Sequence, residues 1–138
     1  MNTVEQILMS KGPDVIVAVG TNTVIEAAKM MAQANVGSVI IKEGQAPVGI
    51  FTERDLLRKV VATGKDPNTT PLSQVMSSPV RTVELATPIA EASQVLTTHH
   101  IRHLAVVEEN ALVGMISFRD VLKAEVELAE ARSQGPVC

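Results

Sequence analysis

The chain has 138 residues, of which 46% are hydrophobic and 20% are charged, and its formal net charge at pH 7 is −3. This balance is typical of a globular protein and argues against a disordered chain. There is no Trp or Tyr, Phe occurs twice, and no run of Lys or Arg is present, so neither the aromatic platforms nor the basic fields that bind nucleic acids are expected.

The first half of the chain predicts a short helical lead-in followed by strands and helices. Asn22 and Thr23 favour the start of a helix, and Val24, Ala27 and Met31 recur behind them at helical spacing. Two aliphatic runs of strand length come next, on either side of a turn. The expected elements are the lead-in Val4–Leu8, a strand at Val15–Ala18, a helix opening after Thr23, strands at Gly37–Lys42 and Val48–Phe51, and a helix opening at Glu53.

The second half predicts the same order after a polar linker at 64–71. Thr87 and Pro88 favour a helix start, and Ile89, Ala92 and Leu96 have helical spacing. The expected elements are a second lead-in at Leu72–Met76, a strand at Val80–Val83, a helix opening at Pro88, strands at His103–Glu108 and Val113–Ile116, and a helix from Phe118 through Ala131 that stops at Gly135-Pro136.

The two halves are copies of one unit. Gly49–Asp55 (GIFTERD) recurs as Gly114–Asp120 (GMISFRD), an offset of 114 − 49 = 65, and the same offset aligns Leu57 with Leu122. We therefore expect an α/β (α+β) fold of two β-α-β-β-α repeats, which pack together because neither could bury enough surface alone. The predicted division is repeat 1 with its lead-in at 1–63, a linker at 64–71, repeat 2 with the last helix at 72–132, and a tail at 133–138.

Each copy has a hydroxyl residue at a strand-to-helix junction and an aspartate three residues later. The pairs are Thr52 with Asp55 and Ser117 with Asp120. One interpretation is a capping box, in which hydroxyl and acid only satisfy the start of the helix. The other is a ligand site, because a helix N-terminus attracts phosphate and a carboxylate can accept hydrogen bonds from two ribose hydroxyls. The residues alone do not separate the two.

The duplicated motif, with the aliphatic strand and hydrophobic helix before it, resembles tandem cystathionine-β-synthase (CBS) domains, a Bateman module. The resemblance covers about Met1 to Ala131. It implies two repeats packed sheet to sheet with pseudo-two-fold symmetry. It also implies two clefts that bind AMP, ADP, ATP, S-adenosylmethionine or NAD, although some members bind nothing known.

The resemblance also implies which residues line the two clefts. The ribose-binding acid falls on Asp55 or Asp120, and each cleft draws on the lead-in of the other copy. By motif position the Asp55 cleft takes Thr52, Ile50 for adenine and Met76–Arg81, including Val80 and Arg81, and the Asp120 cleft takes Ser117, Met115 for adenine and Lys11–Ile16, including Ile16.

The two clefts are predicted to be unequal. The resemblance implies that phosphates meet basic residues just before the middle strand, where repeat 2 has Arg102 and His103 and repeat 1 has uncharged Gly37 and Ser38. We expect Arg102 and His103 to favour phosphate in the Asp55 cleft. Each motif adds one further cation, Arg54 in repeat 1 and Arg119 in repeat 2.

The predicted function is a regulatory module that senses an adenosine nucleotide, most simply AMP, ADP or ATP, and transmits the bound state to an unknown effector protein. The alternatives are a ligand-independent interaction scaffold and a sensor of S-adenosylmethionine or NAD. We expect no enzyme activity and no bound cofactor. The last helix, with apolar Leu122 and Val126, predicts either a homodimer or packing on its own domain.

Other features suggest no further chemistry. The apolar stretches are far shorter than the roughly 20 residues that cross a bilayer, and Met1–Lys11 lacks the core of a signal peptide, so a soluble cytoplasmic protein is expected. A metal at His99, His100 and His103 is not expected, since no further ligands complete the set. The one cysteine, Cys138, excludes an internal disulfide and is poorly placed for a nucleophile.

Overall fold

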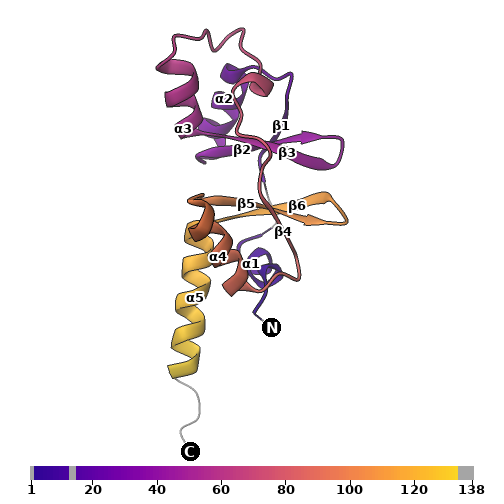
Figure 1. The fold of residues 1–138 in the computed structure, drawn as a ribbon, viewed down its shortest axis with the longest axis vertical. Helices are drawn as coiled ribbons and strands as arrows, with labels where there is room; N and C mark the ends of the chain where they lie inside the picture. The colour runs from indigo at the N-terminus through magenta and orange to yellow at the C-terminus, as the bar shows by residue number, and fades with distance from the viewer. Residues whose placement is uncertain (1, 13–14, 134–138) are drawn as a thin grey trace, which may run out of the picture. The chain divides into compact units, whose positions relative to one another are not determined.

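The computed structural model describes residues 2–12 and 15–133 (Figure 1). The chain folds into two compact units. The Asp55 unit comprises residues 15–80 and 110–112, and the Asp120 unit comprises residues 2–12, 81–109 and 113–133. The units therefore differ from the sequence repeats, because each repeat packs with the lead-in of the other. Cys138 and the expected stop at Gly135-Pro136 lie outside the described residues.

The Asp55 unit is built on a three-stranded sheet of order β1-β2-β3. β1 is parallel to β2 and β2 is antiparallel to β3, as expected for a crossover helix followed by a hairpin. Its elements are β1 (Val17–Val19), α2 (Val24–Ala34), β2 (Ser38–Glu43), β3 (Ala46–Thr52), α3 (Glu53–Asp55), the π-helix η1 (Leu56–Val61) and the 3-10 helix η2 (Leu72–Gln74).

The Asp120 unit repeats this plan with a sheet of order β4-β5-β6. Its last helix is a regular α-helix where the first repeat has a π-helix. Its elements are α1 (Val4–Lys11), β4 (Thr82–Glu84), α4 (Ile89–His99), β5 (His103–Glu108), β6 (Ala111–Ser117) and α5 (Phe118–Ser133). The predicted pair of β-α-β-β-α repeats is confirmed.

Helix starts follow the local signals. Thr23 caps α2 by accepting a hydrogen bond from the backbone of Glu26, whose side chain binds back to the cap. Pro88 lies at the N-cap of α4, one residue before the first helical position. Asn35 and His100 end α2 and α4 in the left-handed conformation, with φ of 56° and 53°.

Each unit has a hydrophobic core of its own. In the Asp55 unit, Phe51 and Val39 from the sheet are fully buried with Val24 from α2. In the Asp120 unit, α1 contributes buried Val4 and Leu8 to a cluster with α4 and the sheet. The first lead-in, expected as a helix-like turn at Val4–Leu8, is a helix that extends through Lys11, and its buried residues are Val4, Ile7 and Leu8.

Among residues 2–12 and 15–133, no helix combines the length and apolar character needed to cross a membrane.

Candidate functional site

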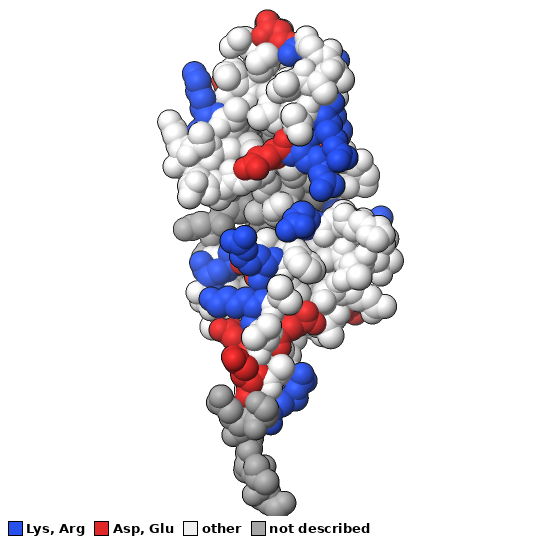
Figure 2. All heavy atoms as spheres, turned by 90° about the vertical axis from the view of Figure 1, so that its left-hand side faces the viewer, with Lys and Arg blue, Asp and Glu red and all other residues white. Residues whose placement is uncertain are grey.

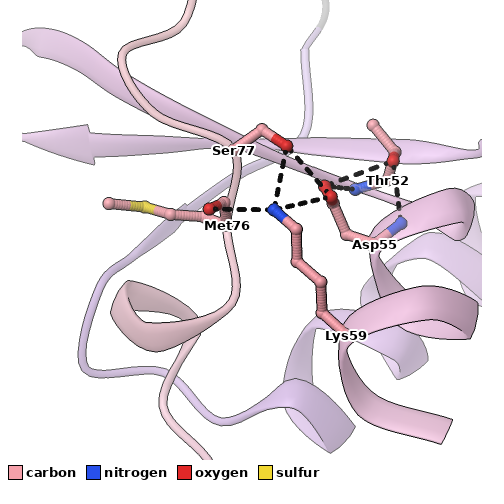
Figure 3. A network of polar contacts seen from close by, with 5 residues as sticks. All are labelled: Thr52, Asp55, Lys59, Met76 and Ser77. Atoms are coloured by element: carbon pink, nitrogen blue, oxygen red, sulfur yellow. Dashed lines mark hydrogen bonds and ion pairs between the residues drawn. The ribbon is translucent and has the colours of Figure 1, made fainter. Parts of the chain in front are cut away.

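Asp55 lies in the first turn of α3 and is almost fully buried, with 5% of its surface exposed. Oδ2 accepts hydrogen bonds from Thr52 N at 3.0 Å and Thr52 Oγ1 at 3.2 Å. Oδ1 accepts one from Ser77 Oγ at 2.9 Å and pairs with Lys59 Nζ at 3.1 Å. Figure 3 shows these side chains converging on the carboxylate from the end of β3, from η1 and from the segment after η2. Both oxygens of Asp55 therefore have partners within the chain.

Asp120 has the matching position in the first turn of α5 but different partners. Its Oδ2 accepts hydrogen bonds from Ser117 N at 2.8 Å and from Lys11 Nζ at 2.8 Å. Lys11 also donates to the carbonyl oxygen of Met115 at 3.0 Å. The side chain of Asp120 is 23% exposed, against 7% for Asp55. Within the described part of the chain, Oδ1 of Asp120 accepts no hydrogen bond.

The capping interpretation of the motif is confirmed. Thr52 accepts from the backbone N–H of Asp55, and Ser117 accepts from that of Asp120. Each aspartate uses Oδ2 for the return bond to the cap. Because the capping box occupies Oδ2, a ligand would meet Oδ1 in each copy. Oδ1 of Asp55 contacts Ser77 and Lys59, whereas Oδ1 of Asp120 accepts no hydrogen bond within the described residues.

Both repeats have a glycine at the first position of the motif, Gly49 and Gly114, and close packing explains it. A Cβ on Gly49 would lie 2.6 Å from Sδ of Met76 and 3.1 Å from the backbone oxygen of Ser77. A Cβ on Gly114 would lie 2.9 Å from both methyl groups of Leu8. Each glycine therefore lets the lead-in of the other repeat approach the strand closely.

The charges around Asp120 shift two pKa values. Burial alone would raise the pKa of Asp120, but the hydrogen bond and charge of Lys11 and the bonds from Ser117 outweigh it, so that pKa is lowered. The pKa of His103 is lowered by burial first, and then by the positive charges of Arg102 and Lys11, against a smaller opposing effect of Asp120. His103 is therefore neutral at pH 7.

The basic residues expected near phosphate lie in the Asp120 unit. Arg102 is exposed, its carbonyl accepts from the N–H of Phe118 at 2.7 Å, and its guanidinium lies 5.9 Å from the centre of that ring. On α5, basic Arg119 and Lys123 precede the acidic residues Glu125, Glu127 and Glu130. In the lower half of the view in Figure 2, basic side chains (blue) are likewise grouped above acidic ones (red). The predicted role of Arg102 and His103 at Asp55 stays a prediction.

The other expected site residues are distributed between the two units. Ile50 lies half-buried in β3, where its N–H and C=O pair with the backbone of Ser77 at 2.9 and 2.8 Å. Gly37 accepts from the N–H of Glu53 at 3.0 Å. The remaining positions are Arg54, exposed on α3, Val80, buried, and Ile16, half-buried, in the Asp55 unit, and Arg81, exposed beside β4, and Met115, half-buried on β6, in the Asp120 unit.

A groove of about 300 Å³ opens between α1 and α5 beside Asp120. It is lined by Gln6, Ile7, Ser10, Lys11, Ile89, Asp120, Lys123, Ala124, Glu127 and Leu128. No group of three or more His, Cys, Asp or Glu side chains in residues 2–12 and 15–133 is arranged to hold a metal ion.

Two lysines contact the acids, and sequence reasoning missed Lys59, whereas Lys11 belonged to the segment expected at the Asp120 cleft. Lys59 follows Asp55 by four residues, a spacing that places side chains together on a helix and could have identified it. Lys11 was only the first residue of an expected segment, and its partner lies 109 positions away, so no local pattern indicated the contact.

Comparisons with known proteins place these features in a family. The sequence model of the CBS domain family matches residues 4–62 and 72–127 of this chain. A mitochondrial CBS domain-containing protein of Arabidopsis thaliana is 35% identical over 133 residues, which cover 90% of this chain and 65% of that protein. The chain thus spans less than two thirds of this relative.

Two solved structures have nearly the same fold. A protein from Burkholderia ambifaria, described as a signal-transduction protein with CBS domains, has a TM-score of 0.84 at 32% identity, with 99% of both chains covered. A CBS domain protein from Pyrobaculum aerophilum complexed with AMP has a TM-score of 0.80 at 31% identity, covering 94% of this chain and 99% of that one.

Proposed function

Since this chain belongs to the CBS-domain family and contains two of its repeats, we propose that it senses an adenosine nucleotide, AMP, ADP or ATP, and transmits the bound state to a partner protein. A CBS pair is a regulatory module. The nucleotide, the partner and the absence of any chemical step are what we propose for this chain in particular. S-adenosylmethionine and NAD are the alternative ligands.

The observation that carries the proposal is the open carboxylate oxygen of Asp120 beside cationic groups. Oδ1 of Asp120 accepts no hydrogen bond within the described residues, and Lys11 Nζ lies 2.8 Å from Oδ2 of the same group. An acceptor for hydroxyls next to a cation suits a ribose that carries phosphate. A relative with the same fold is complexed with AMP, which supports an adenine nucleotide.

Thermal unfolding with candidate ligands tests the proposal. AMP, ATP, NAD and S-adenosylmethionine are added in turn, and because the chain has no Trp or Tyr, the melt is followed by circular dichroism or calorimetry. A ligand at 100 times its dissociation constant adds about 2.7 kcal/mol to the free energy of unfolding. A rise in melting temperature with an adenine nucleotide is the expected result. No rise with any of the four ligands would favour a ligand-independent interaction scaffold.

Signal transmission requires that the nucleotide bind two conformations of the chain with different affinities. Since the effector is unknown, the conformational half of this statement is tested first. Amide hydrogen exchange with and without AMP should change at residues outside the ligand contacts. Changes confined to the contacts would leave a binding protein without a transmitted signal.

We also propose that the chain forms a homodimer through equivalent apolar positions of the two repeats. Leu57 and Val61 are 60% and 64% exposed, and Leu122 and Val126 are each 49% exposed. The pairs match at the repeat offset, since 122 − 57 and 126 − 61 both equal 65. Apolar side chains exposed on the same helix face of both repeats favour contact with a second copy.

Light scattering coupled to gel filtration tests the dimer. The wild type should have twice the chain mass, and the double variant Leu122→Glu, Val126→Glu should be monomeric. Met9→Glu is the control, because Met9 is 79% exposed but lies outside these positions. A monomeric wild type would contradict the proposal.

The cytoplasm stays the predicted location. The Arabidopsis relative is named as mitochondrial, so fractionation of the native protein is the direct measurement.

A further inference from the structure

The two motif acids differ in their hydrogen-bond partners, although they occupy the same position in each repeat. Both oxygens of Asp55 accept hydrogen bonds or pair with a cation within the chain. A ligand hydroxyl could reach Asp55 only by displacing Ser77 or Lys59. Asp120 presents an oxygen that accepts no hydrogen bond within the described residues.

One residue difference between the repeats accounts for much of this. Lys59 lies on η1, and the equivalent residue on α5 is Ala124, since 59 + 65 = 124. Lys59 Nζ contacts Asp55 Oδ1 at 3.1 Å, Ser77 Oγ at 3.3 Å and the backbone oxygen of Met76 at 3.4 Å (Figure 3). The lysine therefore ties α3 and η1 to the lead-in segment across the carboxylate. Ala124 has no group that could do the same.

A second, independent difference lies before the middle strands. Gly37 and Arg102 are equivalent, since each accepts a backbone hydrogen bond from the first residue of the motif helix, Glu53 or Phe118. A Cβ on Gly37 would lie 3.1 Å from Oε1 of Glu53, so a carboxylate stands at this point in the Asp55 unit. In the Asp120 unit the same point has the guanidinium of Arg102 against the ring of Phe118.

Charge within each unit therefore separates the two acids further. An anionic group beside Gly37 would meet the carboxylate of Glu53, which repels it. An anionic group beside Asp120 would meet the ammonium of Lys11, and the positive charge of Arg102 also lies in this unit near His103. The electrostatics and the carboxylate oxygen without a hydrogen bond therefore both favour Asp120 as the acid that meets a ligand.

On the basis of the proposed nucleotide binding, we propose that in the wild-type chain Asp120 accepts the hydrogen bonds of the ribose hydroxyls. Lys59 and Ser77 occupy Asp55, which is a structural residue and does not bind ribose. Lys59 is then the residue that sets the number of nucleotides bound per chain. This ranking reverses the one expected from Arg102 and His103 in the sequence, because it includes the burial and the partners of Asp55.

Isothermal titration with AMP and with adenosine tests this proposal through the stoichiometry. The wild type should bind one molecule per chain, and Asp120→Asn should weaken binding at least about tenfold, a loss of about 1.4 kcal/mol. The variant Lys59→Ala, Ser77→Ala gives repeat 1 the side chain of Ala124 and removes the second partner of Asp55, and it should bind two molecules. Arg58→Ala, next to Lys59 but without a contact to Asp55 in the described residues, should still bind one.

Three outcomes would overturn the proposal. They are two molecules bound by the wild type, loss of binding in Asp55→Asn but not in Asp120→Asn, and a stoichiometry of one in the Lys59→Ala, Ser77→Ala variant. Circular dichroism confirms that each variant is folded. Adenosine separates the role of the carboxylate from that of the phosphate, because it has the ribose hydroxyls and no charge.

A failure of the proposed function can be distinguished from a failure of this inference. If no variant binds AMP or adenosine, the proposed function is wrong, and the melting temperature still decides the state of the two acids. Asp55→Asn should lower the melting temperature more than Asp120→Asn does, because Asp55 is buried among four contacts. Equal shifts would overturn the structural role of Asp55.

Discussion

The ammonium of Lys11 lies 2.8 Å from Oδ2 of Asp120, and this contact joins residues that are 109 positions apart in the chain. It brings the end of the N-terminal helix α1 to the start of the C-terminal helix α5. The N-terminal lead-in thus completes the surroundings of the acid in the second repeat.

The pKa of Asp120 should rise when Lys11 is replaced by methionine. Burial raises this pKa and Lys11 is the main group that lowers it, with Ser117. A carboxyl with a lowered pKa stabilises the fold above its unfolded value of about 3.9, and that contribution is lost as the pH falls through the folded value. Lys11→Met should therefore reduce the stability at neutral pH and weaken its dependence on pH below about 4.

Carboxyl carbon chemical shifts, followed by NMR against pH, measure this pKa. The control is Lys123→Met, which removes another lysine of the same groove that has no ion pair with Asp120 in the described residues. His103 and Glu127 also lie near and are unchanged in both variants. An equal shift in the two variants would show a general charge effect and no specific pair.

Truncation of Leu8 should destabilise the Asp120 unit. Leu8 is 6% exposed and packs in a cluster with α4 and the second sheet. Leu8→Ala should cost about 2–5 kcal/mol in the free energy of unfolding, as for other buried leucines. Urea denaturation measures the cost, and Met9→Ala, at a residue 79% exposed, should be nearly neutral.

Amide hydrogen exchange locates the effect of Leu8→Ala. Protection should fall in β5 and β6 more than in β2 and β3, because Leu8 belongs to the Asp120 unit. The opposite distribution would contradict the assignment of α1 to that unit.

Alanine should be tolerated less well at Gly49 than at Gly114. At Gly49 the new Cβ would lie 3.1 Å from the backbone oxygen of Ser77, which pairs with Ile50, so the main chain must move. At Gly114 it would meet only the ends of a leucine side chain, at 2.9 Å. We expect Gly49→Ala to cost about 1–3 kcal/mol, the range for overpacking, and Gly114→Ala to cost less. Equal costs in urea denaturation would mean that the backbone contact is not the decisive one.

The fold should lose stability as the pH falls from 7.5 to 5.5, and His103 should cause part of the loss. Its pKa in the fold is lowered, chiefly by burial and then by Arg102 and Lys11, with Asp120 opposing. The unfolded chain therefore takes up a proton near pH 6.5 that the folded chain resists, so stability present above that pH is lost below it. Melting temperatures of His103→Gln should fall less over this range. An unchanged slope would remove His103 from the explanation.

Much of the fold could be predicted from local signals. The helices that begin at Glu53 and Phe118 start where the hydroxyl and acid of a capping box predict them, and the strand His103–Glu108 has the predicted bounds. The strands β1 and β4 begin two residues later and end one residue later than predicted, because these short strands are defined by their pairing with β2 and β5. The π-helix after Asp55 had no signal in the sequence.

By itself the sequence determined that the chain is a duplicated β-α-β-β-α unit with one acid per repeat, because capping, hydrophobic period and duplication are all properties of residues near one another. Only the tertiary structure decided which partners each acid has. Asp55 is contacted by Lys59 and Ser77, whereas Asp120 is contacted by Lys11, and among the residues that the structure describes its Oδ1 accepts no hydrogen bond. These partners depend on how distant segments pack, and two copies of one motif therefore differ in chemistry.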